Sequence, residues 1–531
     1  MPNYPETNRE LRDNDLSHTD NISLAESNRR RLTRRQSIKI RHGEILSDIE
    51  KTKFGWLHVK KLMTYSIGFF TNAYQLLIIN IIILMMGCVY YKDNDNTVPI
   101  YIDTLIKASS HIGILIGQLL FGVASDKLGR KRIYGTELLI IVVSGAASAL
   151  SGSTVSGMSV FAQLFIWRVF LGVGIGGDYP LSATITSEGA KTKHRGAMMA
   201  AIFAMQGVGI VAAALMSIII LAIFKNAVYQ DQNNLDFVWR LCLGLGCIPA
   251  CIGIYFRLTI SETPRYAMKT EMDTEEADMH KKEASFIEFY RHFKKWKNFK
   301  VLLATSITWF TLDVGFYGIN LNTGLIIEAI GFSGDIVKDP WNSLFKNSIG
   351  NLIVSFLGIL PGYWVSVFLV DRIGRKPIQL VGFGILTILM LILGFGFNQI
   401  RQASVALFIV IFTIMQFFFT FGPNTTTFII PGEVFPTKYR STAHGISAAC
   451  GKLGAIISQV GFFQMRDIGG RNQSIPLILI IFSFIMFIGF MFTFLLPETK
   501  GKSLEELSDE FTSNNNSNSI HSNDSNQNTQ F

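Results

Sequence analysis

Four residues of this chain have the types and spacing for reversible binding of an anion. Trp309, Asp313 and Tyr317 in "WFTLDVGFYG" recur every four residues, which places them along one face of a helix. Lys452 stands in a separate apolar stretch, "AACGKLGAII". A buried lysine with hydrogen-bonding neighbours suits an anion such as phosphate, and a nearby carboxylate can take a proton and switch the local charge. An ion pair between Asp313 and Lys452 is the structural alternative.

A fifth candidate is Asp178, which follows four glycines in "WRVFLGVGIGGDYPLSATITSE". Gly172, Gly174 and Gly177 satisfy the G-x-G-x-x-G pattern, but that pattern indicates a dinucleotide site only between a β-strand and a soluble helix. Here the surrounding sequence is apolar over the length of a membrane span. We therefore expect no cofactor, interpret the glycines as sites of close helix packing, and take Asp178 as a functional residue.

Three further residues add hydrogen-bonding capacity to apolar segments: Tyr179, Gln206 and Asn424. Asn424 follows Pro423, which interrupts its helix and frees backbone groups that are tolerated only beside protein or water. Tyr179 and Asn424 lie 245 positions apart, as counterparts in two repeats would. Taken singly, Trp309 and Tyr317 are more typical of packing or interfacial aromatics, and Gln206 of a bond between helices.

The composition indicates a membrane protein. Of 531 residues, 49% are hydrophobic and only 16% are charged, which is too apolar for an ordinary soluble protein of several domains. A bilayer core is crossed by about 20 apolar residues. Twelve such runs are expected, at 62–90, 102–124, 133–152, 160–183, 196–223, 238–257, 298–330, 346–370, 377–397, 403–432, 442–466 and 474–497.

Several function classes lack support in the sequence. The five cysteines lie inside the apolar runs without metal-ligand spacing. Neither H-E-x-x-H nor a nucleophile motif occurs, so neither a metal nor a cofactor is expected, and an enzyme is the weakest alternative. The net charge of +9 follows from basic loops and a basic N-terminal tail that suits anionic lipid, so nucleic acid need not be a partner.

Lysine and arginine concentrate in the loops between spans 2–3, 4–5, 8–9 and 10–11, which predicts that this side and both termini are cytoplasmic. The N-terminal tail is polar and basic and has no cleavable signal pattern, so the first span is expected to direct insertion. The sequence thus predicts a multi-pass protein of the lipid bilayer.

Two motifs occur twice at one spacing. "GVASDKLGRKR" and "FLVDRIGRKPI" lie 245 positions apart, and so do "SEGAKTKHRGA" and "GEVFPTKYRST". Two independent motifs at one offset indicate a duplicated six-helix unit. Paired acids and bases at helix ends can form bonds that break as the halves rock, so we expect a cytoplasmic gate made of Asp126, Gly129, Arg130, Lys131, Glu188, Arg195, Asp371, Gly374, Arg375, Lys376, Glu433 and Arg440.

The expected domain organisation follows from this duplication. A charged and aromatic linker is expected to form short cytoplasmic helices at the membrane surface, and the tail from about Ser513 is low-complexity and expected to be disordered. The expected parts are a basic cytoplasmic tail at 1–61, six-helix halves at 62–257 and 298–497, a linker at 258–297 and a cytoplasmic tail at 498–531.

From about Gly55 to Leu507 the chain resembles the major facilitator superfamily. It is most similar to the phosphate:proton symporters, and among these to fungal high-affinity phosphate transporters. The motifs that carry this resemblance are "GIGGDYPLSATITSE", "WFTLDVGFYG", "PGYWVSVFLVDRIGRKPIQL" and "FGPNTTTFIIPGEVFPTKYRSTAHGISAACGK", with the more widely shared "PETKGKSLEEL".

The resemblance implies an all-α membrane protein of 12 transmembrane helices in two pseudo-symmetric halves, in the plasma membrane. It also implies that phosphate and protons are carried together and that Asp178 and Asp313 are candidates for the proton route. Phosphate would be held between the halves by Tyr179, Gln206, Trp309, Asp313, Tyr317, Asn424 and Lys452.

The first span departs from this family. Its usual F-T-D-x-Y-D is "FTNAYQ" here, with Asn72 and Gln75 in place of two acids. Amides keep the shape and hydrogen bonding of carboxylates but cannot carry a proton. We therefore expect altered or weakened proton coupling and a more positive cavity. The alternatives are a carrier of an organic phosphate such as a glycerophosphodiester and a phosphate sensor with little transport.

Overall fold

The structure is a computed structural model that describes residues 55–152, 157–259, 286–470 and 473–512, together with Ser47 and Lys51. Most of the expected N-terminal tail, most of the linker and the C-terminal tail beyond Thr512 lie outside these residues. The part described divides into a small unit that includes Ser47 and Lys51 and a large unit that contains every helix considered below. All regular structure in the described residues is helical.

The N-terminal set of helices comprises α2 (Trp56–Leu77), α3 (Ile79–Tyr90), α4 (Ile100–Leu128), α5 (Arg130–Ile133), α6 (Thr136–Ala149), α7 (Val160–Gly189), α8 (Arg195–Ile223), α9 (Lys225–Gln230), α10 (Leu235–Leu245) and α11 (Ile248–Leu258). The C-terminal set comprises α14 (Trp296–Asn320), α15 (Thr323–Ala329), α16 (Pro340–Val354), α17 (Leu360–Ile373), α18 (Arg375–Phe395), α19 (Phe397–Ala403), α20 (Val405–Phe419), α21 (Thr425–Val434), α22 (Arg440–Arg466) and α23 (Ile475–Thr493). Two short helices, α13 (Phe286–Phe293) and α24 (Leu504–Thr512), flank the C-terminal set.

Eleven helical segments within the described residues are long and apolar enough to cross a membrane. The first runs over Leu62–Tyr90, as expected from the sequence. The third expected span, at 133–152, is the shorter helix α6 of 14 residues. That length rises about 21 Å, less than the roughly 30 Å of a bilayer core. The arrangement is consistent with the twelve-helix fold predicted from the sequence.

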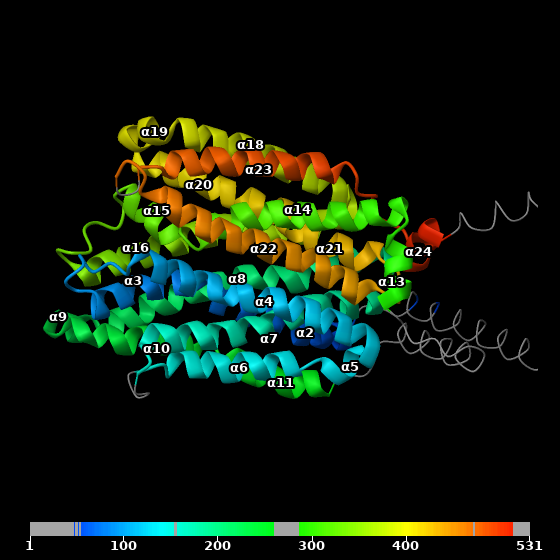
Figure 1. Ribbon diagram of the computed structural model, residues 1–531, viewed down its shortest axis with the longest axis horizontal. Coiled ribbons are helices and arrows are strands. Elements are labelled where there is room, and N and C mark those ends of the chain that lie inside the picture. The colour runs from blue at the N-terminus through cyan, green and yellow to red at the C-terminus, as the bar shows by residue number, and fades with distance from the viewer. Residues whose placement is uncertain are drawn as a thin grey trace, which may run out of the picture. The chain divides into compact units, whose positions relative to one another are not determined.

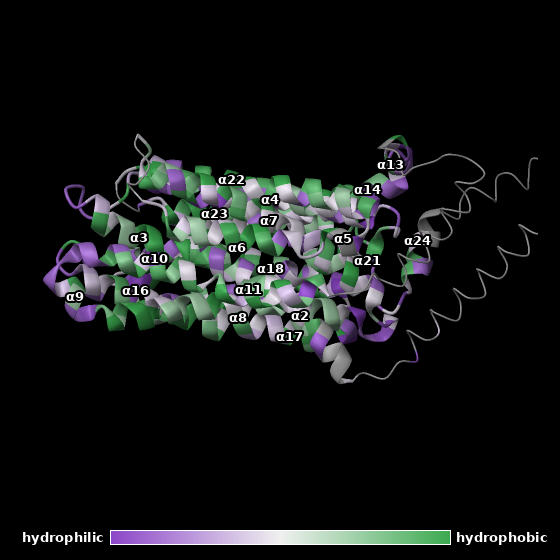
Figure 2. Cartoon of the chain, turned by 90° about the horizontal axis from the view of Figure 1, so that it is seen from below, coloured by the Kyte–Doolittle hydropathy of each residue, from purple (hydrophilic) through white to green (hydrophobic). Residues whose placement is uncertain are grey.

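Hydrophobic residues run along the helices and hydrophilic residues gather at their two ends (Figure 2). Helices α5, α13 and α24 lie at one end, called the motif end here because α5 follows the first D-x-x-G-R-K turn (Figure 1). Helices α9, α15 and α19 lie at the other end, called the outer end. A transmembrane bundle with two polar faces follows from this distribution.

The D-x-x-G-R-K turns need their glycines. Gly129 ends α4 with φ 94° and Gly374 ends α17 with φ 113°, backbone values that L side chains rarely adopt. Each turn is followed at once by a helix that begins with its arginine, Arg130 or Arg375. The repeated motif thus makes the same sharp corner in both sets.

Close packing of α4 on α7 also requires glycine. A Cβ on Gly172 would lie 2.1 Å from the Ser110 carbonyl oxygen, and one on Gly113 would lie 2.0 Å from the Val169 carbonyl oxygen. The glycines of "GVGIGGDY" therefore let two membrane helices approach closely. Packing of this kind agrees with the interpretation made from the sequence.

Helices of the two sets meet along the centre of the bundle. Helix α4 packs against α22 as well as α7, and α8 packs against α17 as well as α2. Helix α14 packs against α22 within the C-terminal set. Residues of α4, α7 and α8 therefore face residues of α14, α17 and α22 across a shared seam.

Candidate functional site

Lys452 lies at the centre of this seam. Its Nζ is 2.8 Å from Asp313 Oδ2 and donates to the Tyr317 hydroxyl at 3.0 Å. Lys452 and Asp313 are each only 1% exposed. The expected pairing of a buried lysine with hydrogen-bonding neighbours is present, and so is the ion pair that formed its structural alternative.

The close approach of α22 to α14 sets this geometry. A Cβ on Gly451 would lie 2.5 Å from Trp309 Cδ1 and 2.9 Å from Asp313 Oδ2. Trp309, Asp313 and Tyr317 share one buried face of α14, as their spacing predicts. Gly451 therefore lets Lys452, the next residue, reach that face.

The N-terminal set contributes Tyr179 of α7. Lys452 Nζ lies 5.4 Å from the centroid of the Tyr179 ring and 4.2 Å from that of Tyr317. Both distances fall within the range of cation–π attraction. The Trp309 ring lies 6.5 Å from that of Tyr179. One amine is thus enclosed by aromatic rings from both sets.

Helix α7, which carries Tyr179, is capped by Ser159, the residue before its first. The Ser159 side chain accepts a hydrogen bond from the Ala162 backbone N–H at 3.2 Å. Phe203 and Phe428 stack with their centroids 4.4 Å apart, and both lie against Tyr179. This packing helps to fix the position of the Tyr179 ring.

Asn424 and Gln206 are buried, and no contact described in the structure joins either of them to Lys452. Asn424 donates to the Tyr363 hydroxyl at 2.8 Å. It ends a π-helical turn, Thr420–Asn424, that contains Pro423. The expected interruption of this span is therefore present. Gln206 is 4% exposed, and its Nε2 has no hydrogen-bond partner.

Asp178 lies in a different cluster, within the N-terminal set. Its Oδ1 is 2.7 Å from Arg257 NH1, and Arg257 NH1 is also 2.7 Å from Glu137 Oε1. Ser182 donates to Asp178 Oδ1 at 2.8 Å. All three charged side chains are fully buried. Asp178 is thus held by an arginine and makes no described contact with Lys452.

Of the two altered residues of the first span, Asn72 contacts this cluster, whereas Gln75 contacts α10. Asn72 Nδ2 donates to Asp178 Oδ2 at 2.8 Å, and its Oδ1 has no partner. Gln75 Nε2 donates to the Leu243 carbonyl at 3.1 Å, and its Oε1 has no partner. The amide of Asn72 therefore keeps a bond to Asp178 that a carboxylate could make only while protonated.

At the motif end, Glu188 joins the two sets. Its Oε1 lies 3.1 Å from Arg130 NH2 and 3.2 Å from NH1 of Arg440, which belongs to the C-terminal set. Asp126 lies 3.2 Å from Arg130 and accepts from the Thr442 backbone at 2.8 Å. These contacts fasten the N-terminal set to the C-terminal set.

Glu433 forms the matching cluster in the second repeat. Its Oε1 lies 2.8 Å from Arg375 NH2 and 2.8 Å from NE of Arg195, which belongs to the N-terminal set. Asp371 lies 2.9 Å from Arg375 and accepts from the Ala197 backbone at 2.8 Å. Each glutamate is therefore held by one arginine from its own set and one from the other.

The structure describes a side-chain contact for only one of the two remaining motif lysines, Lys376 and Lys131. Lys376 donates to the Phe494 carbonyl at 2.8 Å. Lys131 lies in α5, and its side chain is outside the described residues. Ten of the twelve predicted gate residues thus form the two glutamate-centred clusters with their glycine corners.

Several buried residues near these clusters are not predicted by the motifs. Tyr363, Arg257 and Glu137 are fully buried, and Lys107 and Arg168 are 1% exposed. Four of these five are ionisable residues inside expected spans, the same criterion that identified Asp178. Applied throughout, that criterion finds them, whereas Tyr363 carries no such signal.

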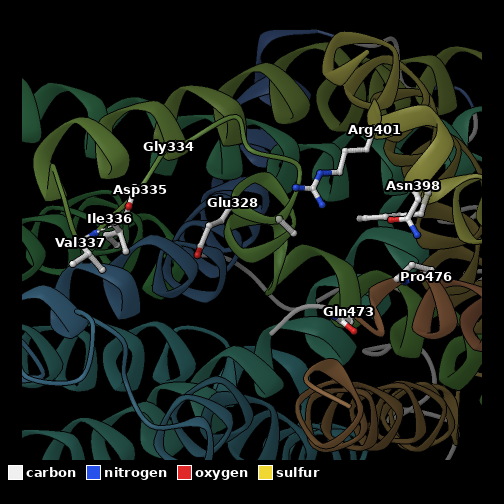
Figure 3. A pocket seen from close by; sticks show the side chains of 11 residues that line it. Glu328, Gly334, Asp335, Ile336, Val337, Asn398, Arg401, Gln473 and Pro476 are labelled. Atoms are coloured by element: carbon white, nitrogen blue, oxygen red, sulfur yellow. Dashed lines mark hydrogen bonds between the residues drawn. The ribbon is translucent and has the colours of Figure 1, made fainter. Parts of the chain in front are cut away.

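The large cavities lie away from Lys452. One of about 640 Å³ opens near the outer end, where Arg401 extends from α19 and Glu328 from α15 (Figure 3). Glu328 and Ile336 also line a neighbouring cavity of about 520 Å³. Among the described residues, no group of three or more histidine, cysteine or acidic side chains is placed to hold a metal ion.

Comparisons with known proteins relate the chain to transporters. A family model described as "Sugar (and other) transporter" matches residues 61–511. The chain is 42% identical to the repressible high-affinity phosphate permease of Neurospora crassa, covering 88% of this chain and 89% of that protein. It is 42% identical to the inorganic phosphate transporter PHO84 of Saccharomyces cerevisiae, with 87% and 86% covered.

A solved structure shares the fold. The chain is similar to the major facilitator superfamily proton:xylose symporter XylE bound to 6-bromo-6-deoxy-D-glucose, with a TM-score of 0.67 and 20% identity. The match covers 85% of this chain and 98% of that one.

Proposed function

Because the chain belongs to the sugar (and other) transporter family of the major facilitator superfamily, we propose that it imports inorganic phosphate by alternating access. Two relatives that match most of its length are named as phosphate transporters. The observation that carries the proposal is the buried amine of Lys452, enclosed by Asp313, Tyr317 and Tyr179 from both sets.

The Lys452–Asp313 pair gives the site its chemistry. A phosphate oxygen can replace the Asp313 carboxylate on the amine, because both are anionic hydrogen-bond acceptors. A proton on Asp313 makes this exchange easier by removing the competing charge. Release of phosphate, together with loss of that proton from Asp313, restores the pair. Binding and release therefore leave no unpaired charge buried in the bundle.

The clusters at the motif end form a gate whose ion pairs must break before the two sets can separate there. Two of their ion pairs, Arg440–Glu188 and Arg195–Glu433, join the N-terminal set to the C-terminal set. The other two, Arg130–Glu188 and Arg375–Glu433, lie within one set. Breaking the Arg440–Glu188 and Arg195–Glu433 pairs separates the sets at that end and leaves each glutamate with its own arginine. Each carboxylate thus stays paired in both states, which limits the cost of rocking.

The altered first span limits which residues can couple protons to transport. Asn72 and Gln75 cannot carry protons, so we assign a coupled proton to Asp313 or to the Asp178–Glu137 cluster. We therefore propose symport with a weaker dependence on external pH than a first span with two acids would give. Both termini are cytoplasmic in this proposal, and the protein lies in the plasma membrane.

The packing around Lys452 favours a small substrate. Aromatic centroids in this group lie 4.4 to 6.5 Å apart, with Phe203 stacked on Phe428. Tight rings of this kind suit a phosphate ion better than the bulkier glycerophosphodiester, which remains the second candidate substrate.

The test is uptake of labelled phosphate in cells that lack their own phosphate transporters, at two external pH values. Lys452→Ala should abolish uptake, because the amine that binds the anion is lost. Surface protein should be retained, because the Asp313 carboxyl left without its partner can be neutralised by one proton. Lys338→Ala, at a lysine whose side chain is 85% exposed, should leave uptake unchanged.

Full uptake by Lys452→Ala would refute this site. Uptake of labelled glycerophosphodiester that unlabelled phosphate does not inhibit would instead identify an organic phosphate as the substrate. Phosphate-dependent signalling without measurable flux would show a sensor in place of a transporter.

A further inference from the structure

A row of polar residues on α4 leads from the outer end toward the centre of the bundle. Asp103 lines the outer cavity of about 520 Å³. Lys107 and His111 follow it at intervals of four residues, so the three lie on one helix face. At 1.5 Å per residue the row descends about 12 Å. All three side chains are buried.

Helix α22 carries a matching row. Arg466 lines the same cavity, and Gln459 and Lys452 precede it by seven and fourteen residues, which keeps them on one face. This row spans about 21 Å. Because α4 and α22 pack against each other, both rows lie in one seam between the cavity and Lys452.

Lys107 sits where the two rows and the end of α14 meet. Its Nζ is 2.9 Å from Asp103 Oδ1 and 3.1 Å from Asn322 Oδ1. It also lies 4.8 Å from the centroid of the Phe463 ring of α22. Asn322 in turn donates to Gln459 at 3.3 Å. A second buried lysine thus bridges the sets, with a carboxylate and an aromatic ring as at Lys452.

His111 connects the two lysines. Its Nδ1 lies 3.1 Å from the Lys107 carbonyl, and its ring packs edge-on against Tyr317 with centroids 4.5 Å apart. Tyr317 accepts from Lys452. His111 Nε2 is buried and has no hydrogen-bond partner. An orphan polar atom therefore lies in the seam between Lys107 and the candidate site, and such an atom normally has a partner.

We propose that Lys107 is an outer phosphate-binding station through which the anion passes between the outer cavity and Lys452. The phosphate takes the place of Asp103 on the amine, as it takes the place of Asp313 on Lys452. Because His111 Nδ1 faces the Lys107 carbonyl, Nε2 of the neutral ring is an acceptor, and it gains a partner when a P–OH group of a protonated phosphate donates to it as the anion moves inward. Two weak sites in series suit transport, because each must release the ion that it binds. The inference rests on the proposed phosphate transport.

A purely structural role for Lys107 predicts something different. If the amine only holds the outer ends of the two sets together, then Asp103, Lys107 and Asn322 act as one latch. Loss of any of them would then change uptake in the same direction. As a binding station, Lys107 attracts phosphate while Asp103 competes with it, so their removal has opposite effects.

The experiment measures KM and maximal rate for labelled inorganic phosphate, corrected for surface abundance, in Lys107→Gln, Asp103→Asn and Asn322→Ala. Lys107→Gln should raise KM about tenfold, because a charge-assisted bond to phosphate is lost. Asp103→Asn should lower KM about threefold, because an anionic competitor is removed. Asn322→Ala breaks the bridge but keeps the charge, so its KM should stay within about twofold of the original.

A KM that is unchanged in Lys107→Gln, or shifted the same way in Lys107→Gln and Asp103→Asn, would overturn the proposal while leaving phosphate transport intact. If Lys107→Gln fails to reach the surface, the fall in KM of Asp103→Asn decides alone. Absence of phosphate uptake by the unaltered protein would instead refute the proposed function, and this inference with it.

Discussion

Two of the buried ionic clusters in the described residues use different cations in different places. Lys452 and Asp313 meet on the seam between the helix sets, next to Tyr179. Arg257 holds Asp178 and Glu137 inside the N-terminal set. Both clusters are buried, yet only the first faces residues of both sets.

The difference teaches which cluster can exchange partners. An ammonium group is a compact charge with three rotatable donors, whereas a guanidinium is a rigid fork that matches carboxylates. Lys452 has a single carboxylate at 2.8 Å, and one proton neutralises it. Arg257 has two carboxylates at 2.7 Å, so its removal leaves two acids without a cation. We therefore assign substrate exchange to Lys452 and structural support to Arg257.

The variant Arg257→Met tests this comparison and is expected to have the largest effect. Removing one partner from a buried ionic group costs about 3–5 kcal/mol, so surface abundance and thermal stability should both fall sharply. Abundance is measured by labelling an epitope at the cell surface. Arg401→Met, at an exposed arginine, is the matched control. Normal abundance with lost transport would show that Arg257 acts in transport and is not a support.

Tyr317→Phe should have an intermediate effect that sharpens the assignment to Lys452. The variant keeps the ring but removes the hydroxyl, which accepts from Lys452 at 3.0 Å and can donate its own proton to a phosphate oxygen bound there. A hydrogen bond to a charged group contributes about 1.5–3 kcal/mol, so KM for phosphate should rise roughly tenfold or more. Kinetics of labelled phosphate uptake check this, with Tyr290→Phe at an exposed tyrosine as control. An unchanged KM would mean that this hydroxyl does not help to hold the anion.

The smallest effect is expected from Asn72→Asp combined with Gln75→Asp. Asn72 touches Asp178 at 2.8 Å, so an acid there gives the N-terminal cluster a further proton-binding group. The ratio of uptake at acidic to neutral external pH should increase about threefold. Asn398→Asp, at an exposed asparagine, controls for added charge. An unaltered ratio would mean that these positions do not govern proton coupling.

Much of the fold could be predicted from sequence because its signals are local. Apolar runs predict membrane helices, and the first matches Leu62–Tyr90. The repeated D-x-x-G-R-K motif needs Gly129 and Gly374 at sharp corners, and both adopt positive φ. Helix α6 shows the limit of this reasoning, because apolar character extends beyond its 14 helical residues.

The candidate site could be predicted only in part. Spacing places Trp309, Asp313 and Tyr317 on one face, and the structure sets Lys452 against it. Spacing does not reveal that Asp178 pairs with Arg257, 79 positions away. Nor does it reveal that Lys107 contacts Asn322 across 215 positions. Such pairings depend on which helices become neighbours.

The amino-acid sequence by itself determined the membrane helices, the duplication at an offset of 245 and the few ionisable residues that must find partners in a dry interior. Tertiary structure alone decided how those residues pair: Lys452 with Asp313 on the seam, Asp178 with Arg257 within one set, and Glu188 and Glu433 each between arginines of both sets. The reason is physical. Helical periodicity fixes which face a side chain occupies, but only the packing of one helix on another fixes which charge it meets.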